Sequence, residues 1–344
     1  MEKIDYIIVG AGYAGTFLAH HMLEKGISFR LFSDGKQGAS AVSAGMVNPA
    51  VLKKFTTFWL AQQQIDLLHK SCEEIQNYTG KNYLIDEQVH RIFHDENEKN
   101  LWLKKSVNED LVPFLSADFK EFDVVRNPFG SGEVMQSCRL NVANFFSDIH
   151  THFKNKGYLI EEAFEYSLID VDNSSYKGFH FKKIIFCEGM GVLNNPFFSN
   201  IDVNPNKGHH LKVRLDSQLP FQATLKKKHF LFPLSDDLYY YGGTYDRDHL
   251  DDGIDEAAVE QLKNGLSEFY PLDFTVEEIK TGFRPTVKDR RPIIGSHAEY
   301  PNLIVFNGLG ARGVLNGNYF AMHLVDHLES GIPLNAEISL QRFS

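Results

Sequence analysis

Cysteine and tryptophan are both scarce in this chain of 344 residues, which has three of the former and two of the latter. The cysteines, Cys72, Cys138 and Cys187, are odd in number and lie in dissimilar surroundings. They therefore indicate neither a disulfide framework nor a thiolate metal site. We expect all three to stay reduced.

Long hydrophobic runs and a surplus of positive charge are also missing. The longest apolar runs, such as residues 184–187 and 303–306, are far shorter than the roughly 20 residues that span a bilayer. Residues 1–5 lead into a strand-like run without a cationic, apolar targeting segment, so we expect a cytoplasmic protein with no membrane span. The net charge of −10 opposes association with a polyanion, which makes nucleic acid an unlikely partner.

What the chain does contain is an alternation of short apolar runs and longer helical stretches, typical of an α/β protein. Its length and its 43% hydrophobic content suffice for two domains or one elaborate domain. Residues 4–9 are predicted to form a buried strand, residues 16–25 a helix, and residues 29–32 a second, parallel strand. This is one βαβ unit.

Further along, the hydrophobic spacing predicts four more helices and five more strands. The helices cover residues 57–78, 141–157 with Asn141 as the N-cap, 256–269 and 314–328; the strands cover 184–187, 210–215, 230–233, 238–244 and 303–306. The strands between about 207 and 282 are antiparallel in character, which indicates a second, sheet-based domain.

A glycine-rich turn, Gly10-Ala11-Gly12-Tyr13-Ala14-Gly15, lies between the first strand and the first helix. Its glycines permit a tight turn and close approach of a pyrophosphate, so the unit predicts a bound dinucleotide. An acidic residue should hold the adenosine ribose at the end of the second strand. The chain has Ser33 followed by Asp34 there, and either of them can take this role; the nearby Arg30 and Lys36 keep NADP open as well.

Several later blocks resemble the D-amino-acid oxidase superfamily of flavoproteins. They are Ala39–Val47, Cys187-Glu188-Gly189, Lys207-Gly208-His209, Gly282-Phe283-Arg284-Pro285, Asp289–Gly295 and Asn307–Val314. Within the superfamily the chain is most similar to glycine oxidases and to the oxidase half of a bifunctional enzyme that modifies the wobble uridine of tRNA. The resemblance covers nearly the whole chain and is weakest between about Lys81 and Val134.

The resemblance implies an α/β fold in which a Rossmann-like FAD-binding domain is interleaved with an antiparallel-sheet α+β substrate domain. The FAD-binding domain would comprise residues 1–80, 138–200 and 286–344, and the substrate domain residues 81–137 and 201–285. The cofactor would be FAD. Gly282 stands where some relatives have a cysteine that tethers the flavin, so we expect FAD to be noncovalent.

The residues expected to contact FAD follow from the glycine turn and from the resembling blocks. They are Gly10, Gly12, Tyr13, Ala14, Gly15, Ser33, Asp34, Ser40, Ser43, Ala44, Gly45, Met46, Phe164, Cys187, Glu188, Gly189, Gly310, Ala311, Arg312, Gly313, Val314 and Leu315. In the last block, glycines precede a long helix whose N-terminus would stabilise the negative charge of a reduced flavin.

Four residues are expected on the substrate side. Arg284 would grip a carboxylate with two parallel hydrogen bonds, and the resemblance places Arg312, Tyr245 and His209 around the same cavity. The adjacent pairs His20-His21 and His209-His210 diverge on a helix or strand and lack further ligands at metal spacing, so no metal site is proposed.

The resemblance implies oxidation of a small amine or amino acid. Hydride would pass from the α-carbon to flavin N5, water would hydrolyse the imine, and molecular oxygen or another electron acceptor would regenerate the flavin. Two alternatives are kept: oxidation of a carboxymethylaminomethyl-type amine on tRNA, and a non-catalytic flavin-binding protein.

Overall fold

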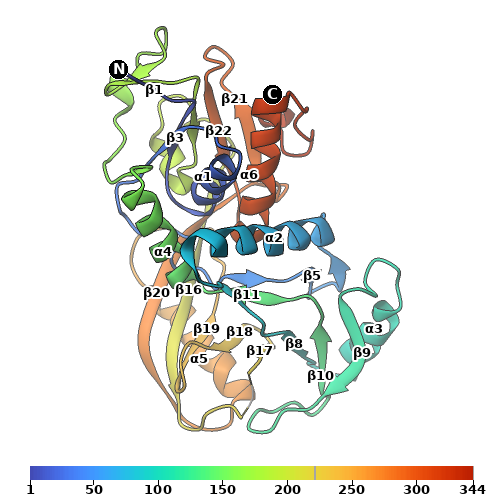
Figure 1. Cartoon of the computed structure of the whole chain (residues 1–344). Coiled ribbons are helices and arrows are strands. Elements are labelled where there is room, and N and C mark those ends of the chain that lie inside the picture. The colour runs from blue at the N-terminus through green and yellow to red at the C-terminus, as the bar shows by residue number, and fades with distance from the viewer. Residues whose placement is uncertain (221, 344) are drawn as a thin grey trace.

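A computed structural model describes residues 1–220 and 222–343. The chain forms two sheet-containing halves, and helix α2 (Ala61–Thr79) crosses the molecule between them (Figure 1). Both chain ends lie in the half that contains the parallel sheet. The two halves exchange segments several times along the chain, as the colour order in Figure 1 shows.

The first half is built on a six-stranded sheet. Its strands, in spatial order, are β12 (Leu159–Ile160), β3 (Phe29–Phe32), β2 (Tyr6–Val9), β15 (Lys183–Phe186), β22 (Leu303–Asn307) and β21 (Ile293–Ser296). All neighbours are parallel except β21 and β22, which are antiparallel. The predicted βαβ unit is therefore confirmed, and it lies at the centre of this sheet.

Alternation along β2 explains the layers on either side of this sheet. Tyr6 and Ile8 belong to the hydrophobic cluster that contains helices α1 (Tyr13–Glu24) and α6 (Gly313–Ser330). Ile7 and Val9 pack on the opposite side, in a cluster with residues of a small sheet. That sheet consists of β1 (Glu2–Lys3), β14 (Phe179–His180) and β13 (Ser175–Tyr176).

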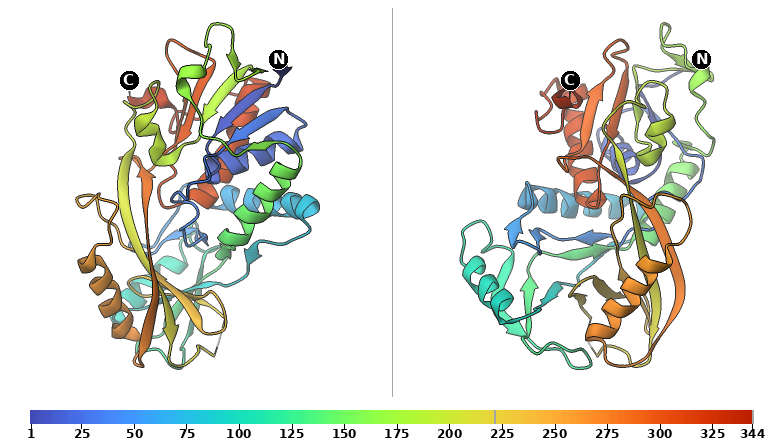
Figure 2. Two further views of the ribbon diagram at one scale, coloured as in Figure 1. Left: turned by 90° about the vertical axis from the view of Figure 1, so that its left-hand side faces the viewer. Right: turned by 180° about the vertical axis from the view of Figure 1, so that it is seen from behind.

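The second half is built on an eight-stranded sheet. In spatial order its strands are β20 (Phe274–Thr286), β16 (Asn204–Leu215), β19 (Leu238–Gly242), β18 (Phe230–Pro233), β17 (Thr224–Lys226), β8 (Val89–Ile92), β10 (Ser131–Val134) and β9 (Leu115–Lys120). Every neighbouring pair is antiparallel except β17 and β8. Strands β16 and β20 form a long ribbon that reaches toward the parallel-sheet half (Figure 2).

Helix α5 (Glu256–Phe269) covers one face of this sheet. Leu211 and Val213 of β16 are buried in the cluster that contains Leu262 and Leu266 of α5. Because neighbouring residues of a strand point to opposite faces, the even-numbered residues of β16 face the other way. That other face closes the site described below.

The remaining elements connect the two halves. A small sheet joins β4 (Met46–Val47), β11 (Cys138–Leu140) and β7 (Leu84–Ile85), and β5 (Ala50–Val51) pairs with β6 (Thr56–Thr57). Helix α3 (Glu96–Ser106) lies between β8 and β10 in sequence, and α4 (Val142–Asn155) follows β11. Short 3-10 helices are η1 (Tyr166–Leu168), η2 (Gly189–Asn194) and η3 (Leu340–Phe343).

Most predicted elements are confirmed, with differences at their ends. Helix 256–269 and strand 230–233 have the predicted bounds, and the Asn141 side chain accepts a hydrogen bond from the Asn144 amide (3.4 Å) as the N-cap of α4. Helix α2 begins at Ala61 instead of residue 57, because Thr56 and Thr57 form β6. Among the described helices, none is both long enough and apolar enough for a membrane span.

Candidate active site

A large cavity lies between the C-terminal ends of the parallel strands and the long ribbon of β16 and β20. Its volume is about 950 Å³, near the upper end of the range of about 300–1,000 Å³ for small-molecule and cofactor sites. It is bordered by the glycine turn after β2, the segment 33–46, the turn after β15, the start of α6 and residues of the eight-stranded sheet. One space therefore collects segments that are far apart in sequence.

The glycine turn leaves room for a ligand at one end of the cavity. Gly10 has φ +101°, and a Cβ there would lie 2.5 Å from the Cys187 carbonyl oxygen. A Cβ on Gly15 would lie 1.8 Å from the Gly10 carbonyl oxygen, so Gly15 permits close packing of α1 on the strand and does not itself border the cavity. No side chain caps α1 at Gly12. Apart from the Tyr13 amide, which donates to the Ser40 hydroxyl, the amides of the first turn are thus left for an anionic ligand such as a pyrophosphate.

The segment between β3 and β4 lies over this turn. The Ser40 hydroxyl accepts a hydrogen bond from the Tyr13 amide (3.2 Å), and the Ser43 and Tyr13 hydroxyls are 2.7 Å apart. Gly45 has φ +63°, and a Cβ there would lie 2.2 Å from the Leu140 carbonyl oxygen. Ser40, Ser43, Ala44, Gly45 and Met46 all border the cavity, as the proposed FAD contact requires.

Ser33 and Asp34 border the same end of the cavity. The Ser33 hydroxyl accepts from the Gly35 amide (3.3 Å), while Asp34 accepts from the Lys36 amide (3.1 Å) and pairs with the Lys36 ammonium (3.2 Å). Both oxygens are already engaged within their own loop. The choice between them as the ribose contact therefore stays open.

Glu188 follows β15 and places a carboxylate at the cavity. It accepts hydrogen bonds from the Tyr166 hydroxyl (2.5 Å) and the Asn195 amide (2.7 Å), and burial raises the pKa of this carboxyl. Phe164, stacked on Tyr176 at 4.2 Å, also borders the cavity. Cys187 and Gly189 border the cavity as well, as the proposed FAD contacts require.

A second uncapped helix start borders the cavity. Helix α6 begins at Gly313 with no side-chain cap from Arg312, and Gly310, Ala311, Gly313 and Val314 border the cavity. By contrast, Asp95, Asn141 and Asp255 cap α3, α4 and α5 with their side chains. The positive end of the α6 dipole is therefore available to a ligand group that becomes negatively charged.

Arg312 and Leu315 do not border the cavity, contrary to expectation. The Arg312 guanidinium donates to the Asn48 carbonyl oxygen (2.9 Å) and lies 3.7 Å from the centre of the Phe58 ring, and burial lowers its pKa to about 10. Leu315 is buried in the core beneath the helix. Arg312 thus fastens the start of α6 to the segment after β4, and the geometry does not support a direct substrate contact.

Arg284 lies in the cavity on the ribbon of β16 and β20. Its Nη1 donates to the Asn206 side-chain oxygen (3.1 Å) and to the Thr244 carbonyl oxygen (3.0 Å). The guanidinium carbon lies 4.4 Å from the centre of the Tyr245 ring, which is 68% exposed at the cavity mouth. Neither Nη2 nor Nε donates to another described residue, so one edge of the guanidinium remains free for a carboxylate.

His209 borders the cavity as expected, but its side chain points toward α5 and away from Arg284, so the geometry does not support a direct substrate contact by the imidazole. Its Nε2 accepts a hydrogen bond from the amide of Asp255, the N-cap of α5, so the ring lies on the α5 face of the sheet. Burial lowers the pKa of His209. The side chain of the neighbouring His210 points to the opposite face of the sheet, which borders the cavity, because adjacent residues of a strand point to opposite faces.

Sequence reasoning missed the supports and neighbours of Arg284. Asn206 is directly opposite Arg284 in the strand register, and a Cβ on Gly208 would lie 2.4 Å from both of its Nη atoms. His210 and Tyr240 border the cavity on the same face of the sheet. If β16 is known to be a strand, alternation places Gly208 and His210 on the same face as Arg284's partner Asn206. This alternation is the signal that could have identified His210.

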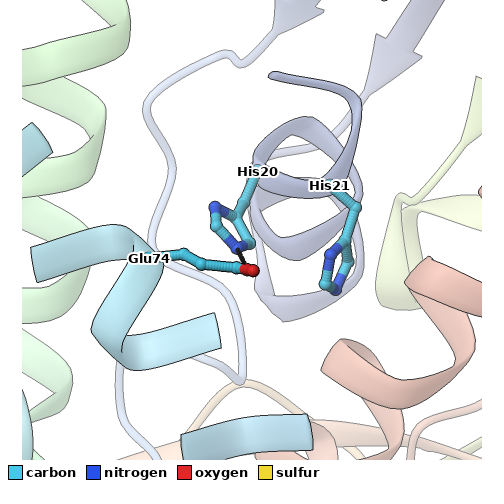
Figure 3. A group of neighbouring side chains, drawn as sticks. All are labelled: His20, His21 and Glu74. Atoms are coloured by element: carbon cyan, nitrogen blue, oxygen red, sulfur yellow. Dashed lines mark hydrogen bonds and ion pairs between the residues drawn. The ribbon is translucent and has the colours of Figure 1, made fainter. Parts of the chain in front are cut away.

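Two groups of side chains resemble metal-ligand sets but are explained by their hydrogen bonds. In Figure 3 the His20 and His21 rings lie close together but bond to different partners: His20 bonds to Glu74 (3.3 Å), while His21 bonds to the Asn318 side chain (2.9 Å). The second group is Asp246, His249 and Asp255. Asp246 accepts from two loop amides and pairs with His249 (2.9 Å), while Asp255 caps α5. Neither group carries a metal proposal.

The chain is similar to known proteins in family pattern, in sequence and in structure. Residues 5–327 match the model of the family described as FAD dependent oxidoreductase (DAO). In sequence, the chain is 24% identical over 311 residues to the tRNA 5-methylaminomethyl-2-thiouridine biosynthesis bifunctional protein MnmC of Campylobacter jejuni subsp. doylei. That match covers 84% of this chain and 45% of the relative, so the chain spans about half the relative's length.

Two further matches extend over most of both partners. The chain is 23% identical over 350 residues to the glycine oxidase of Bacillus subtilis, covering 90% of this chain and 89% of the relative. Its structure is similar to that of glycine oxidase from Geobacillus kaustophilus, with a TM-score of 0.80, 20% sequence identity and coverage of 100% and 98% of the two chains. The fold is thus shared along the whole chain.

Proposed function

The chain belongs to the family of FAD dependent oxidoreductases, and from this premise we propose that it oxidises the C–N bond of a small amine or amino acid. The observation that carries the proposal is the free edge of Arg284 in the cavity that also holds two uncapped helix starts. The glycine oxidases among its relatives support this substrate class.

The residues present fit FAD. The α1 start and its glycines would hold the pyrophosphate, and Ser33 or Asp34 would hold the adenosine ribose. The α6 start would face the isoalloxazine ring, where its amides stabilise negative charge. Bound FAD supplies the two-electron acceptor that takes a hydride from the carbon beside nitrogen, after which water hydrolyses the imine and oxygen or another acceptor regenerates the cofactor.

Arg284 would bind and orient the substrate. Its Nη1 donates to Asn206 and to Thr244, and these bonds restrain rotation of the guanidinium. The N–H groups on its open edge can then donate to a substrate carboxylate. Fixing the carboxylate in this way restrains the adjacent carbon, which is the carbon to be oxidised. Tyr245 covers one face of the guanidinium at the mouth and would limit the entry of water.

We also propose that FAD is held noncovalently. Gly282 borders the cavity where a tethering cysteine would stand. Cys187 borders it too, but burial raises its pKa well above the ordinary value, so the thiol stays protonated and unreactive. The other two cysteines are buried elsewhere.

The test begins with the purified protein, whose flavin spectrum is recorded anaerobically while glycine, sarcosine, proline, D-amino acids and simple amines are added. We expect bleaching by at least one carboxylate-bearing amine, and release of all flavin into the supernatant after acid denaturation. Arg284→Lys should raise KM for that substrate by about 10–100-fold, since a charge-assisted hydrogen bond contributes about 1.5–3 kcal/mol. Absence of bleaching by every amine would refute the proposal.

A second candidate is an amine carried on tRNA, favoured by similarity to the bifunctional MnmC protein. The mouth of the cavity argues against it. Residues 245–255 contain five aspartates and one arginine, and Tyr245 and Asp252 of this segment border the cavity. Such a segment repels phosphates. Retention of tRNA that weakens with salt, together with flavin reduction by an aminomethyl-uridine, would favour this candidate over the first.

A further inference from the structure

Tyr240 and His210 lie beside Arg284 and have no role in the function proposed above. Resting on that function, we propose that they form a neutral hydrogen-bonding subsite, and that the substrate carries an uncharged polar group, such as a hydroxyl or an amide, in addition to its amine and carboxylate. The subsite is formed by the edges of two side chains on neighbouring strands, β16 and β19.

Both residues are mostly buried, but their polar atoms face the cavity and have no partner in the described part of the protein. Each residue is only 7% exposed, and both border the cavity. Within the described part of the chain, neither the Tyr240 hydroxyl nor the His210 ring nitrogens make a hydrogen bond to protein. These polar atoms are not enclosed by protein but open onto the cavity, where a ligand or water can pair with them. Two of them at one wall indicate a ligand with matching groups.

The Tyr240 hydroxyl is within reach of a molecule bound to Arg284. A Cβ placed on Gly243 would lie 3.1 Å from the Arg284 Nη2 and 3.6 Å from the Tyr240 hydroxyl oxygen. The two polar atoms are therefore at most about 7 Å apart, and two hydrogen bonds of about 3 Å to one small molecule can bridge them. A substrate anchored by its carboxylate thus meets the hydroxyl with another of its groups.

Ring stacking fixes the position of the hydroxyl. The Tyr240 ring lies 4.5 Å from His210 at 27° on one side and 4.5 Å from Phe232 at 7° on the other. Arg139 lies 4.2 Å over the Phe232 ring and continues the row. Both faces of Tyr240 are thereby covered, so only its edge, which carries the hydroxyl, can contact a ligand. Such preorganisation lowers the entropic cost of binding.

The subsite is uncharged at neutral pH. Burial lowers the pKa of His210 to about 4, and burial raises the pKa of Tyr240. Three of the charges near His210 are paired with each other, since Glu278 bonds to Lys212 (2.6 Å) and to Lys280 (2.5 Å), and the fourth, Arg284, is the anchor proposed for the substrate carboxylate. A second carboxylate or an ammonium would enter without a counter-charge at considerable cost, whereas a hydroxyl or amide can pair with both neutral groups.

Isosteric substrate pairs test this subsite in the FAD-loaded enzyme. N-(2-hydroxyethyl)glycine is compared with N-propylglycine, and each enantiomer of homoserine with norvaline, by kcat/KM for flavin reduction. In the wild type we expect a preference of about 10–100-fold for the hydroxyl member of at least one pair, mainly through KM. Tyr240→Phe and His210→Phe should reduce that ratio to near one.

Tyr241→Phe is the matched control. Tyr241 is the next residue of the same strand, it points to the α5 face, and its buried hydroxyl has no partner in the described structure. This variant should keep the wild-type ratio. A ratio near one in the wild type, or a ratio that survives in both Tyr240→Phe and His210→Phe, would overturn the subsite.

Binding of unreactive carboxylates keeps the two proposals separable. Titration with 4-hydroxybutanoate and with pentanoate, followed by the change in flavin absorbance, needs no turnover. Tighter binding of the hydroxy acid in the wild type, lost in Tyr240→Phe, supports the subsite even if no amine reduces the flavin. Equal binding of both acids in the wild type contradicts it even if amines are oxidised.

Discussion

Gly208 allows the Arg284 guanidinium to lie flat against β16. A Cβ at this position would lie 2.4 Å from both Nη atoms and 2.6 Å from the guanidinium carbon. No real Cβ approaches other atoms so closely, so any side chain here displaces the arginine. The backbone at Gly208 pairs with Gly282 of β20 on one side, and the adjacent Lys207 bridges to Asp246 on the other, so the backbone would not yield. The position of the substrate anchor therefore depends on a residue with no functional group.

Gly208→Ala should weaken carboxylate binding while the protein stays folded. We expect KM for a carboxylate-bearing substrate to rise about 10–100-fold, because the displaced guanidinium loses charge-assisted hydrogen bonds worth about 1.5–3 kcal/mol. The measurement is steady-state kinetics, with flavin content and the thermal midpoint as checks on folding. An amine that lacks the carboxylate serves as the control, and its kcat/KM should change much less. An unchanged KM for the carboxylate substrate would show that the position of Arg284 does not depend on the missing Cβ of Gly208.

Prediction of single residues succeeded where a motif fixed the backbone and failed where side-chain direction mattered. The glycine turn and Arg284 lie at the cavity as the sequence indicated. His209 was chosen over His210 because the resembling block ends at His209, and a shift of one residue on a strand reverses the face. Arg312 was placed at the substrate because its block resembles a flavin motif, yet its side chain bonds to Asn48.

Elements were predicted best where one hydrophobic pattern dominated. Helix α5 combines an Asp255 cap with a clear apolar face, and its predicted bounds are those observed. Strand β20 was missed, although it is 13 residues long. It is an edge strand rich in charged residues, and its Pro285 lies opposite Pro205, where neither residue can donate a backbone hydrogen bond. Its strand character comes from pairing with β16, which sequence periodicity does not reveal.

The link between β11 and β18 rests on one buried ion pair. Arg139 donates from Nη2 and Nε to Glu87 (2.8 and 3.1 Å) and from Nη2 to the Pro233 carbonyl oxygen (3.1 Å), and both charged residues are at most 5% exposed. The same guanidinium lies over Phe232, next to the stacked Tyr240. This pair therefore joins the small connecting sheet to the wall of the cavity.

Glu87→Leu alone should lower the free energy of unfolding by about 3–5 kcal/mol, because it leaves the Arg139 charge buried without a counter-charge. The double variant Glu87→Leu/Arg139→Met should recover much of that loss, since the unpaired charge is then removed as well. Urea unfolding of the wild type, both single variants and the double variant gives the coupling free energy. Glu161→Ala, which breaks the exposed pair with Lys154, is the control and should change stability by less than about 1 kcal/mol. If the losses of unfolding free energy caused by Glu87→Leu and by Arg139→Met simply added in the double variant, the two residues would not be coupled as a buried ion pair.

At the scale of the whole molecule, the class of fold was predictable from the sequence. The order in which the chain passes between its two sheet-containing halves was predictable only in part. The α/β pattern, the antiparallel second sheet and the return to the parallel sheet near residue 184 are all seen in the structure. Segment 81–134, where the resemblance was weakest, contributes β8, β9 and β10 to the eight-stranded sheet. Pairing of β8 with β17, more than 130 residues later, is a long-range contact that no local pattern encodes. The domain boundaries given from the sequence remain a proposal.

Buried histidines should make stability depend on pH. Burial lowers the pKa of His21 to about 3 and the pKa values of His90, His150, His210 and His229 to about 4. In the unfolded chain these groups titrate near about 6.5, so below that pH the unfolded state binds more protons than the folded state. Stability is therefore complete above about pH 6.5 and falls as the pH drops toward 4, by up to about 1.4 kcal/mol per pH unit for each histidine.

The thermal midpoint measured from pH 7.5 to pH 4.5 should fall steadily below about 6.5. His90→Phe should flatten the decline, because it removes one of the groups that the unfolded chain protonates. Carboxyls with lowered pKa values, such as Glu278 at about 2, lose their contribution only below about pH 4 and do not account for this window. A midpoint that stays constant between pH 7 and pH 5 would be inconsistent with neutral buried histidines.

The strand order of the parallel sheet has a consequence for biosynthesis. Strands β2 and β3 come from the first 32 residues, but β22 and the start of α6, which close the cavity, lie beyond residue 300. At about 5–20 residues per second, a ribosome needs roughly 15–60 s to reach them. During that interval the nascent chain holds a glycine turn with no completed pocket, so we expect cofactor capture to follow release of the chain and the first strands to depend on chaperones meanwhile.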